Sequence, residues 1–113
     1  MGIARFTFAP GGADEFKRLS AQCLEIVRAK DPGTLQYDTF LNEAETHAVV
    51  IERYRDSASL IAHAANIGDE LMAAVIGTAA VCEGELLGDV TDELRARLSD
   101  DGPVRLLTLW QSL

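Results

Sequence analysis

The residues of this chain whose types and spacing could carry out chemistry lie in one segment, between residues 52 and 66. Glu52, Tyr54, His63 and Asn66 fall within it. A histidine has an unperturbed pKa of about 6.5, so it can accept or donate a proton at neutral pH. A carboxylate can stabilise the charged imidazole, and a phenol or an amide can hold a substrate oxygen. The segment therefore predicts a proton-transfer site with His63 as the catalytic group.

Each of these residues also has a purely structural interpretation. His63 could be a half-buried helix residue with a hydrogen-bonded, inert ring, and Glu52 could be a solvated or salt-bridged strand residue. Tyr54 could place its ring in the core and its hydroxyl at the edge. Asn66 lies one turn beyond His63, where it could contact a substrate carbonyl or end the helix together with Gly68. The sequence leaves both interpretations open.

Hydrophobic periodicity predicts the elements that must position these side chains. Residues 3–9 alternate as in a strand, and apolar residues then recur every three or four positions from Phe16 to about residue 30, as on one face of a helix. The Asp31-Pro32-Gly33 turn ends that helix, because proline cannot continue its hydrogen-bond ladder. Residues 34–41 and 47–54 read as two further strands joined by a polar loop.

The second half of the chain continues with a helix that carries His63. Asp56 or Ser57 can cap this helix. The Gly68-Asp69 pair should interrupt it. The remaining expected elements are a short helix over 70–76, a strand over 79–87 with a bulge at Gly84, a helix over 92–98 capped by Thr91, and a last strand over 104–110.

This order of elements predicts an α+β fold. The arrangement is the ferredoxin-like split β-α-β, an antiparallel sheet with helices on one face, followed by an αβ extension. At 113 residues the chain is expected to be a single domain, with a core over about 3–87 and a C-terminal extension over about 88–113.

Charge and composition bear on partners and location. Ten Lys and Arg against eighteen Asp and Glu leave a net charge of −8, which argues against nucleic-acid and membrane-surface partners. No secretory signal is evident, so the cytoplasm is the expected location. Cys23 and Cys82 lie far apart without a C-x-x-C spacing, so both are expected to be reduced core thiols. We predict no metal and no cofactor.

Apolar side chains on both faces of the 47–54 strand indicate that both faces of the sheet are covered. Val50 points to one face, and Val49 and Ile51 point to the other. A second copy of the chain is the simple way to cover the face without helices, so a homodimer is expected. Trp110 is expected to act as a packing anchor at that contact.

The spacing Glu52-x-Tyr54-x5-Leu60-x2-His63 resembles the antibiotic biosynthesis monooxygenase superfamily of dimeric α+β barrels. The Pro10-Gly11-Gly12 turn and the Pro32-Gly33-Thr34-Leu35-x-Tyr37 segment support the resemblance, which covers roughly residues 3–87. It implies a pocket between the helices and the sheet of each subunit. The haem-degrading branch of the family fits poorly, because its iron-ligating histidine corresponds to Ala73 here.

The resemblance implies a small cofactor-independent oxygenase that acts on a hydroquinone, polyphenolic or polyketide-like substrate. In that function His63 would assist proton abstraction, and Tyr54 or Asn66 would bind substrate oxygens with Glu52 close by. Phe6, Phe8 and Tyr37 would form apolar walls for an aromatic ligand. The alternative is a non-catalytic dimeric protein of the same fold that binds a small apolar ligand or regulates a partner, since few polar groups are expected around the pocket.

Overall fold

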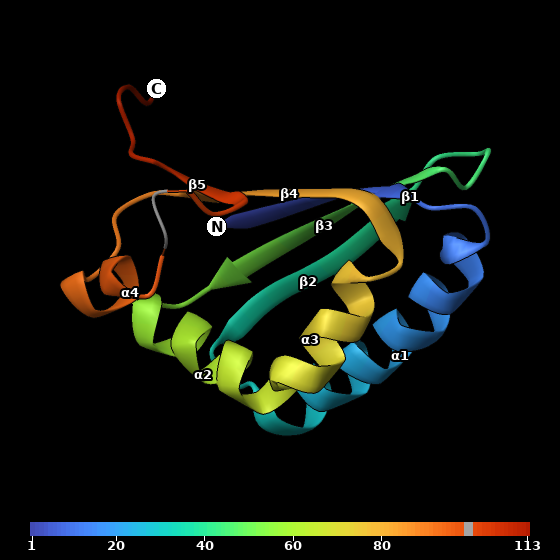
Figure 1. The fold of residues 1–113 in the computed structure, drawn as a ribbon. Helices are drawn as coiled ribbons and strands as arrows, with labels where there is room; N and C mark the ends of the chain where they lie inside the picture. The colour runs from blue at the N-terminus through green and yellow to red at the C-terminus, as the bar shows by residue number, and fades with distance from the viewer. Residues whose placement is uncertain (99–100) are drawn as a thin grey trace.

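The computed structural model describes residues 1–98 and 101–113, and it places the helices on one side of a curved sheet (Figure 1). In chain order the elements are β1 (Gly2–Phe8), α1 (Gly12–Lys30), β2 (Thr34–Leu41), β3 (His47–Tyr54), α2 (Ser57–Ile67), α3 (Asp69–Ile76), β4 (Ala79–Leu87), α4 (Asp92–Ala96) and β5 (Val104–Leu107).

The strand order across the sheet is β2-β3-β1-β4-β5. Strand β1 pairs antiparallel with β3 and β4, and β2 pairs antiparallel with β3. This confirms the predicted α+β class and the split β-α-β arrangement. The extension makes the sheet mixed, because β5 runs parallel to β4.

Three details differ from the sequence expectations. Strand β5 ends at Leu107 because its partner β4 also ends there, with Leu107 opposite Leu87. Helix α4 stops at Ala96, since Leu94 is its one buried residue and the next side chains face solvent. The register shifts of the sheet lie between Thr7 and Phe8 and between Thr34 and Gln36, whereas Gly84 pairs regularly with its neighbours on β1 and β5.

Local signals start and end the helix that carries His63. The Asp56 carboxylate caps α2 by accepting a 2.8 Å hydrogen bond from the Ser59 backbone N–H. Gly68 then breaks the chain between α2 and α3 with φ of 82°, a conformation that favours glycine. Among the described residues, no helix is long and apolar enough to cross a membrane.

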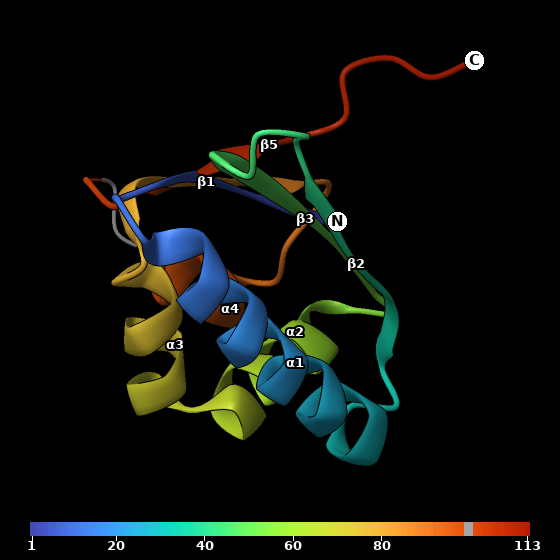
Figure 2. The same ribbon diagram turned by 90° about the vertical axis from the view of Figure 1, so that its right-hand side faces the viewer.

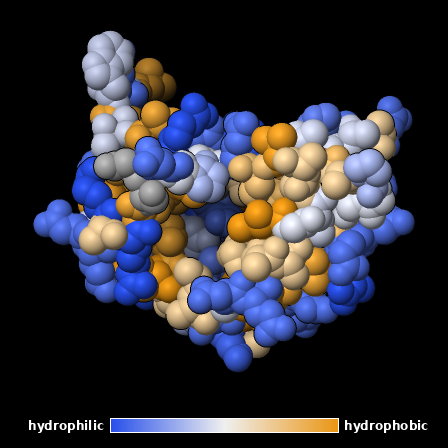
Figure 3. Space-filling model, in the orientation of Figure 1, coloured by the Kyte–Doolittle hydropathy of each residue, from blue (hydrophilic) through white to orange (hydrophobic). Residues whose placement is uncertain are grey.

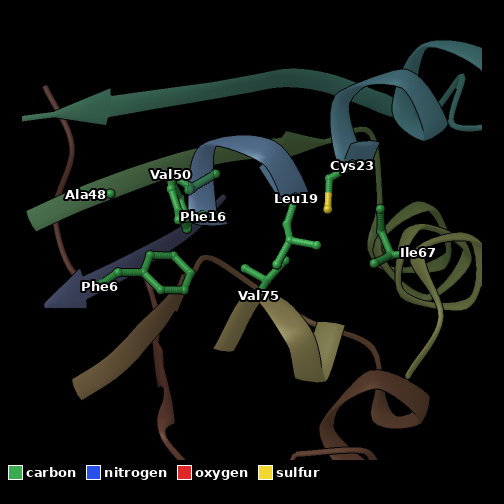
Figure 4. Packing of buried hydrophobic residues seen from close by; sticks show 8 residues of the cluster. All are labelled: Phe6, Phe16, Leu19, Cys23, Ala48, Val50, Ile67 and Val75. Atoms are coloured by element: carbon green, nitrogen blue, oxygen red, sulfur yellow. The ribbon is translucent and has the colours of Figure 1, made fainter. Parts of the chain in front are cut away.

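The hydrophobic core lies between the sheet and helices α1, α2 and α3 (Figure 4). The Phe16 ring packs 5.0 Å from the rings of both Phe6 and Phe8. Both cysteines are free thiols, and Cys23 is part of this core, as predicted.

The other face of the sheet carries no helix (Figure 2). In strand register, Val49 and Ile51 of β3 share this outer face with Ile3 of β1 and Val81 of β4. Val81 is exposed, as is Leu107 of β5. The outer face therefore presents apolar side chains to solvent, beside the ion pairs that Arg5 and Arg105 make with Glu85 on the same face.

Candidate functional site

A buried ion-pair geometry joins Asp31 and His63. The Asp31 carboxylate lies 2.6 Å from His63 Nδ1, and the two residues are only 7% and 4% exposed. A carboxylate can only accept, so Nδ1 carries the proton and donates it. Asp31 therefore orients the imidazole, and the second ring nitrogen, Nε2, is the proton acceptor of the neutral ring.

Asn66 holds the other oxygen of the same carboxylate. Its side-chain N–H donates to Asp31 Oδ1 and lies 3.3 Å from the Lys30 carbonyl oxygen. The asparagine thus fixes Asp31 from the turn of α2 that follows His63. The helix itself ends at Gly68, whose backbone N–H bonds to the Ala64 carbonyl.

The end of α1 delivers Asp31 to this position. The Asp31 backbone N–H bonds to the Val27 carbonyl at 3.1 Å, and its own carbonyl accepts from Thr34 at 3.1 Å. Gly33 then passes so close to α2 that a Cβ atom there would lie 2.1 Å from Ser59 Oγ. The turn and α2 therefore pack with no space for a larger residue.

A second polar pair, Glu52 and Tyr54, comes from the helix-facing side of β3. The Tyr54 hydroxyl donates to Glu52 Oε2 at 2.8 Å. Burial raises the pKa of the Glu52 carboxyl, while the hydrogen bond from Tyr54 and the nearby His63 partly oppose that rise. Gly2 lies opposite Glu52 in the sheet, and a Cβ there would come within 3.3 Å of Glu52 Oε2.

Two tyrosine rings flank the imidazole. The ring centroids of Tyr37 and Tyr54 lie 5.6 Å and 5.5 Å from that of His63. Burial raises the pKa of both phenols, and the negative charge of Glu52 raises it further, so both stay protonated at neutral pH and can donate hydrogen bonds.

The second nitrogen of His63 belongs to a buried ring, since the residue is only 4% exposed. Within residues 1–98 and 101–113, Nε2 makes no hydrogen bond to the protein, and Thr34 Oγ1 is the sole fully buried side-chain polar atom without a partner. Nε2 is therefore not sealed from its surroundings, although the residue as a whole is buried.

Two openings adjoin the aromatic pair. A cleft of about 150 Å³ lies beside Tyr54 and is bordered by the start of α2 and by Leu94 of α4. A more apolar groove of about 660 Å³ runs between α1 and β2 and includes Tyr37. The space-filling view also shows a hollow between the sheet and the helices, with hydrophobic residues at its border and hydrophilic ones in its depth (Figure 3).

The structure brings together most of the residues singled out from the sequence. His63, Asn66, Glu52, Tyr54 and Tyr37 form one cluster. Phe6 and Phe8 do not join it, since they pack on Phe16 in the core. Phe6 is four residues along β1 from Gly2, the partner of Glu52, which places it roughly 13 Å from that end of the strand.

Sequence reasoning missed Asp31, because the Asp31-Pro32-Gly33 turn was interpreted only as a helix stop. A carboxylate at the end of a helix, where the macrodipole disfavours negative charge, was the available signal. Within the part of the chain that the structure describes, no three His, Cys, Asp or Glu residues converge as a metal site would require.

Comparisons with known proteins agree with this fold. The family model for antibiotic biosynthesis monooxygenase matches residues 1–68. MupZ from Pseudomonas fluorescens superposes with a TM-score of 0.77 at 24% identity, over 99% of this chain and 90% of MupZ. An antibiotic biosynthesis monooxygenase of known structure gives 0.63 at 25% identity, over 80% and 97% of the two chains. Rv0793 from Mycobacterium tuberculosis gives 0.59 at 23% identity, over 74% and 88%.

The fold and the helix-side polar cluster define a small α+β protein with a buried polar cluster between sheet and helices. With the family match over more than half of its length, the chain belongs to the antibiotic biosynthesis monooxygenase family. No curated protein sequence matches it. The likeness to MupZ extends through the C-terminal segment that lies outside the family match.

Proposed function

We propose that this protein is a cofactor-independent monooxygenase of a hydroquinone or related polyphenolic substrate. The observation that carries the proposal is the buried Asp31–His63 pair, which leaves Nε2 as an oriented base. Membership of the monooxygenase family supports the reaction class. The Tyr54 hydroxyl donates its proton to Glu52, so its oxygen is free to accept a hydrogen bond from a substrate hydroxyl.

Proton transfer to His63 starts the proposed reaction. Nε2 takes a phenolic proton, and Asp31 stabilises the imidazolium that forms. The electron-rich phenolate passes an electron to dioxygen, and the two radicals combine at a ring carbon to form a peroxide. Loss of water leaves a hydroxyquinone. Hydroquinone and O2 are thus converted to hydroxyquinone and one H2O.

Oxygen uptake with a panel of hydroquinones tests this function. We expect turnover by the wild type and a loss of about 10²–10⁴-fold in His63→Ala, the usual contribution of a general base. His47→Ala is the matched control, because His47 is the other histidine and is exposed at the start of β3. Equal turnover by His63→Ala and the wild type would refute the role of His63.

The near-complete burial of His63 supports the second function, a binding or regulatory protein for a small apolar ligand. Its signature is saturable binding of a hydroquinone or quinone, followed by calorimetry, without oxygen uptake by the wild type. In that outcome the tyrosines and Asn66 would hold the ligand, and Asp31 would only order the ring.

We also propose that the protein is a homodimer in which a second copy covers the outer face of the sheet. Exposed apolar side chains on that face, Val81 and Leu107 among them, support the proposal, because a second copy would remove them from water.

A further inference from the structure

A narrow cleft leads from the surface toward the imidazole of His63. It lies beside Tyr54, whose ring centroid is 5.5 Å from that of His63, and Leu60 of α2 also lines it. Leu60 lies one turn before His63, and residues three apart share a face of a helix. The cleft holds about 150 Å³, whereas ligand pockets usually hold about 300–1,000 Å³. An aromatic ligand therefore needs more space than the cleft offers as it stands.

The C-terminal extension supplies part of the wall of this cleft. Val90 precedes α4, and Leu94 is the one buried residue of that helix, with only 3% of it exposed. Both residues line the cleft, and α4 lies beside the start of α2 (Figure 1). The family match ends at residue 68, so α4 lies outside the matched region. The size of the cleft thus depends on a side chain that the extension adds.

Helix α4 is attached to the rest of the chain by few interactions. It is five residues long and buries Leu94 alone. The Thr91 backbone N–H donates to Ser57 Oγ at 3.1 Å, which joins the start of α4 to the start of α2. A short element with one buried side chain opens at a lower cost in free energy than the elements of the core. Displacement of α4 would therefore leave the sheet and the polar cluster intact.

We propose that α4 is the cover of the ligand site and that Leu94 sets the size of the aromatic ligand that reaches His63. A one-ring ligand enters when the Leu94 side chain gives way, and a two-ring ligand requires a larger displacement of the same wall. The inference rests on the proposed hydroquinone site, and it adds the residue that selects among hydroquinones by size.

Anaerobic titration calorimetry tests this inference, because without dioxygen the proposed reaction cannot consume the ligand. The two ligands are hydroquinone, which has one ring, and 1,4-dihydroxynaphthalene, which has two. The ratio of their dissociation constants is measured for each variant. We expect Leu94→Ala to shift this ratio in favour of the two-ring ligand by about tenfold or more, since one methylene in an apolar pocket changes discrimination by about 10- to 200-fold.

Leu109→Ala is the matched control, because it shortens another leucine of the same extension that is 73% exposed and lies outside the cleft. It should leave both dissociation constants unchanged. Leu94→Phe is the converse variant, and its larger side chain should shift the ratio in favour of the one-ring ligand. Circular dichroism shows whether each variant is folded, and Leu94→Val replaces Leu94→Ala if the alanine variant is not.

The inference is overturned by the same ratio in the wild type, in Leu94→Ala and in Leu94→Phe. That result would mean that the ligand reaches the cluster by another route, such as the groove beside Tyr37, or that Leu94 only supports the fold. A wild type that binds neither ligand would overturn it as well. If the ratio shifts as expected but the wild type takes up no oxygen in air, the proposed reaction fails and the role of Leu94 stands.

Discussion

At the scale of single residues, the carboxylate of Asp31 sets the tautomer and the orientation of the His63 imidazole. Asp31 binds His63 at Nδ1 and is itself held by Asn66, so its position is set from two sides. A buried charge costs free energy unless it is paired and hydrogen-bonded, and here both conditions are met. The arrangement fixes the tautomer of His63 and leaves Nε2 to accept a proton. Two predictions belong to this scale.

Asp31→Asn should slow oxygen uptake by more than about tenfold without unfolding the protein. The amide cannot stabilise an imidazolium, and its N–H₂ group can donate to Nδ1 and reverse the tautomer. Asp38→Asn, on exposed β2, is the control. A folded Asp31→Asn protein with the oxygen uptake of the wild type would show that Asp31 has only a structural role.

Glu52 should make the protein less stable as the pH rises. Burial raises the pKa of this carboxyl in the folded state, so between the unfolded pKa of about 4.3 and the folded value the folded protein binds more protons. The stabilising contribution is full below the unfolded pKa and is lost as the pH rises through the folded one. In this window Glu52→Gln, which keeps a polar partner for Tyr54, should gain stability over the wild type by up to about 1.4 kcal/mol per pH unit.

Urea unfolding of the wild type and Glu52→Gln between pH 4 and pH 8 checks this prediction. Glu83→Gln, an exposed carboxylate on β4, controls for the general effect of removing a charge. The prediction is contradicted if the free energies of unfolding of the wild type and of Glu52→Gln change with pH in the same way.

At the scale of elements, the site depends on how closely the end of α1 approaches the start of α2. Gly33 and Ser59 are both buried, and Gly33 accepts a backbone hydrogen bond from Arg55 at 2.8 Å. The two segments lie against each other without a side chain between them, and this contact helps to bring Asp31 within reach of His63.

Gly33→Ala should therefore destabilise the fold by about 1–3 kcal/mol, the usual cost of overpacking. The added Cβ would lie 2.5 Å from Ser59 Cβ, so removal of the serine side chain is the test of mechanism. Gly33→Ala with Ser59→Gly should lose less stability in thermal or urea unfolding than the two single variants added together. Simple additivity would mean that the two residues do not compete for the same space.

At the scale of the whole molecule, the helices cover one face of the sheet and leave the other open (Figure 2). A sheet with an apolar outer face is stable in water mainly when something covers it. The proposed homodimer provides this cover.

Val81→Arg should make the protein monomeric at concentrations where the wild type is dimeric, because it places a charge in the middle strands of the outer face. Ala73→Arg is the matched control on α3, where the residue is exposed on the helix side. Sedimentation velocity shows whether each variant is a monomer or a dimer. A Val81→Arg protein that still forms the wild-type dimer would show that the outer face is not the interface.

The sequence by itself determined the elements and the faces they present. Alternation predicted β1, and two strand-like runs around a polar loop predicted β2 and β3. Asp56 and Gly68 marked the ends of α2, and residue parity placed Glu52 and Tyr54 on one face of β3. These signals are local, because strand alternation, helix caps and turns depend on residues a few positions apart. The same local signals predicted β5 and α4 to be longer than they are. The length of β5 depends on its pairing with β4, and the length of α4 depends on burial.

Only the tertiary structure decided the partners of the site. Asp31 and His63 are 32 residues apart, and they meet because α1 ends against α2. The tertiary structure also places Phe6 and Phe8 away from the site. Both residues share a strand face with Gly2, which pairs with Glu52, but their rings pack on Phe16. Contacts of this kind follow from how helices dock on a sheet, which no local pattern encodes. The sequence could therefore single out His63 as a base, and the packing of the two helices supplied the carboxylate that orients it.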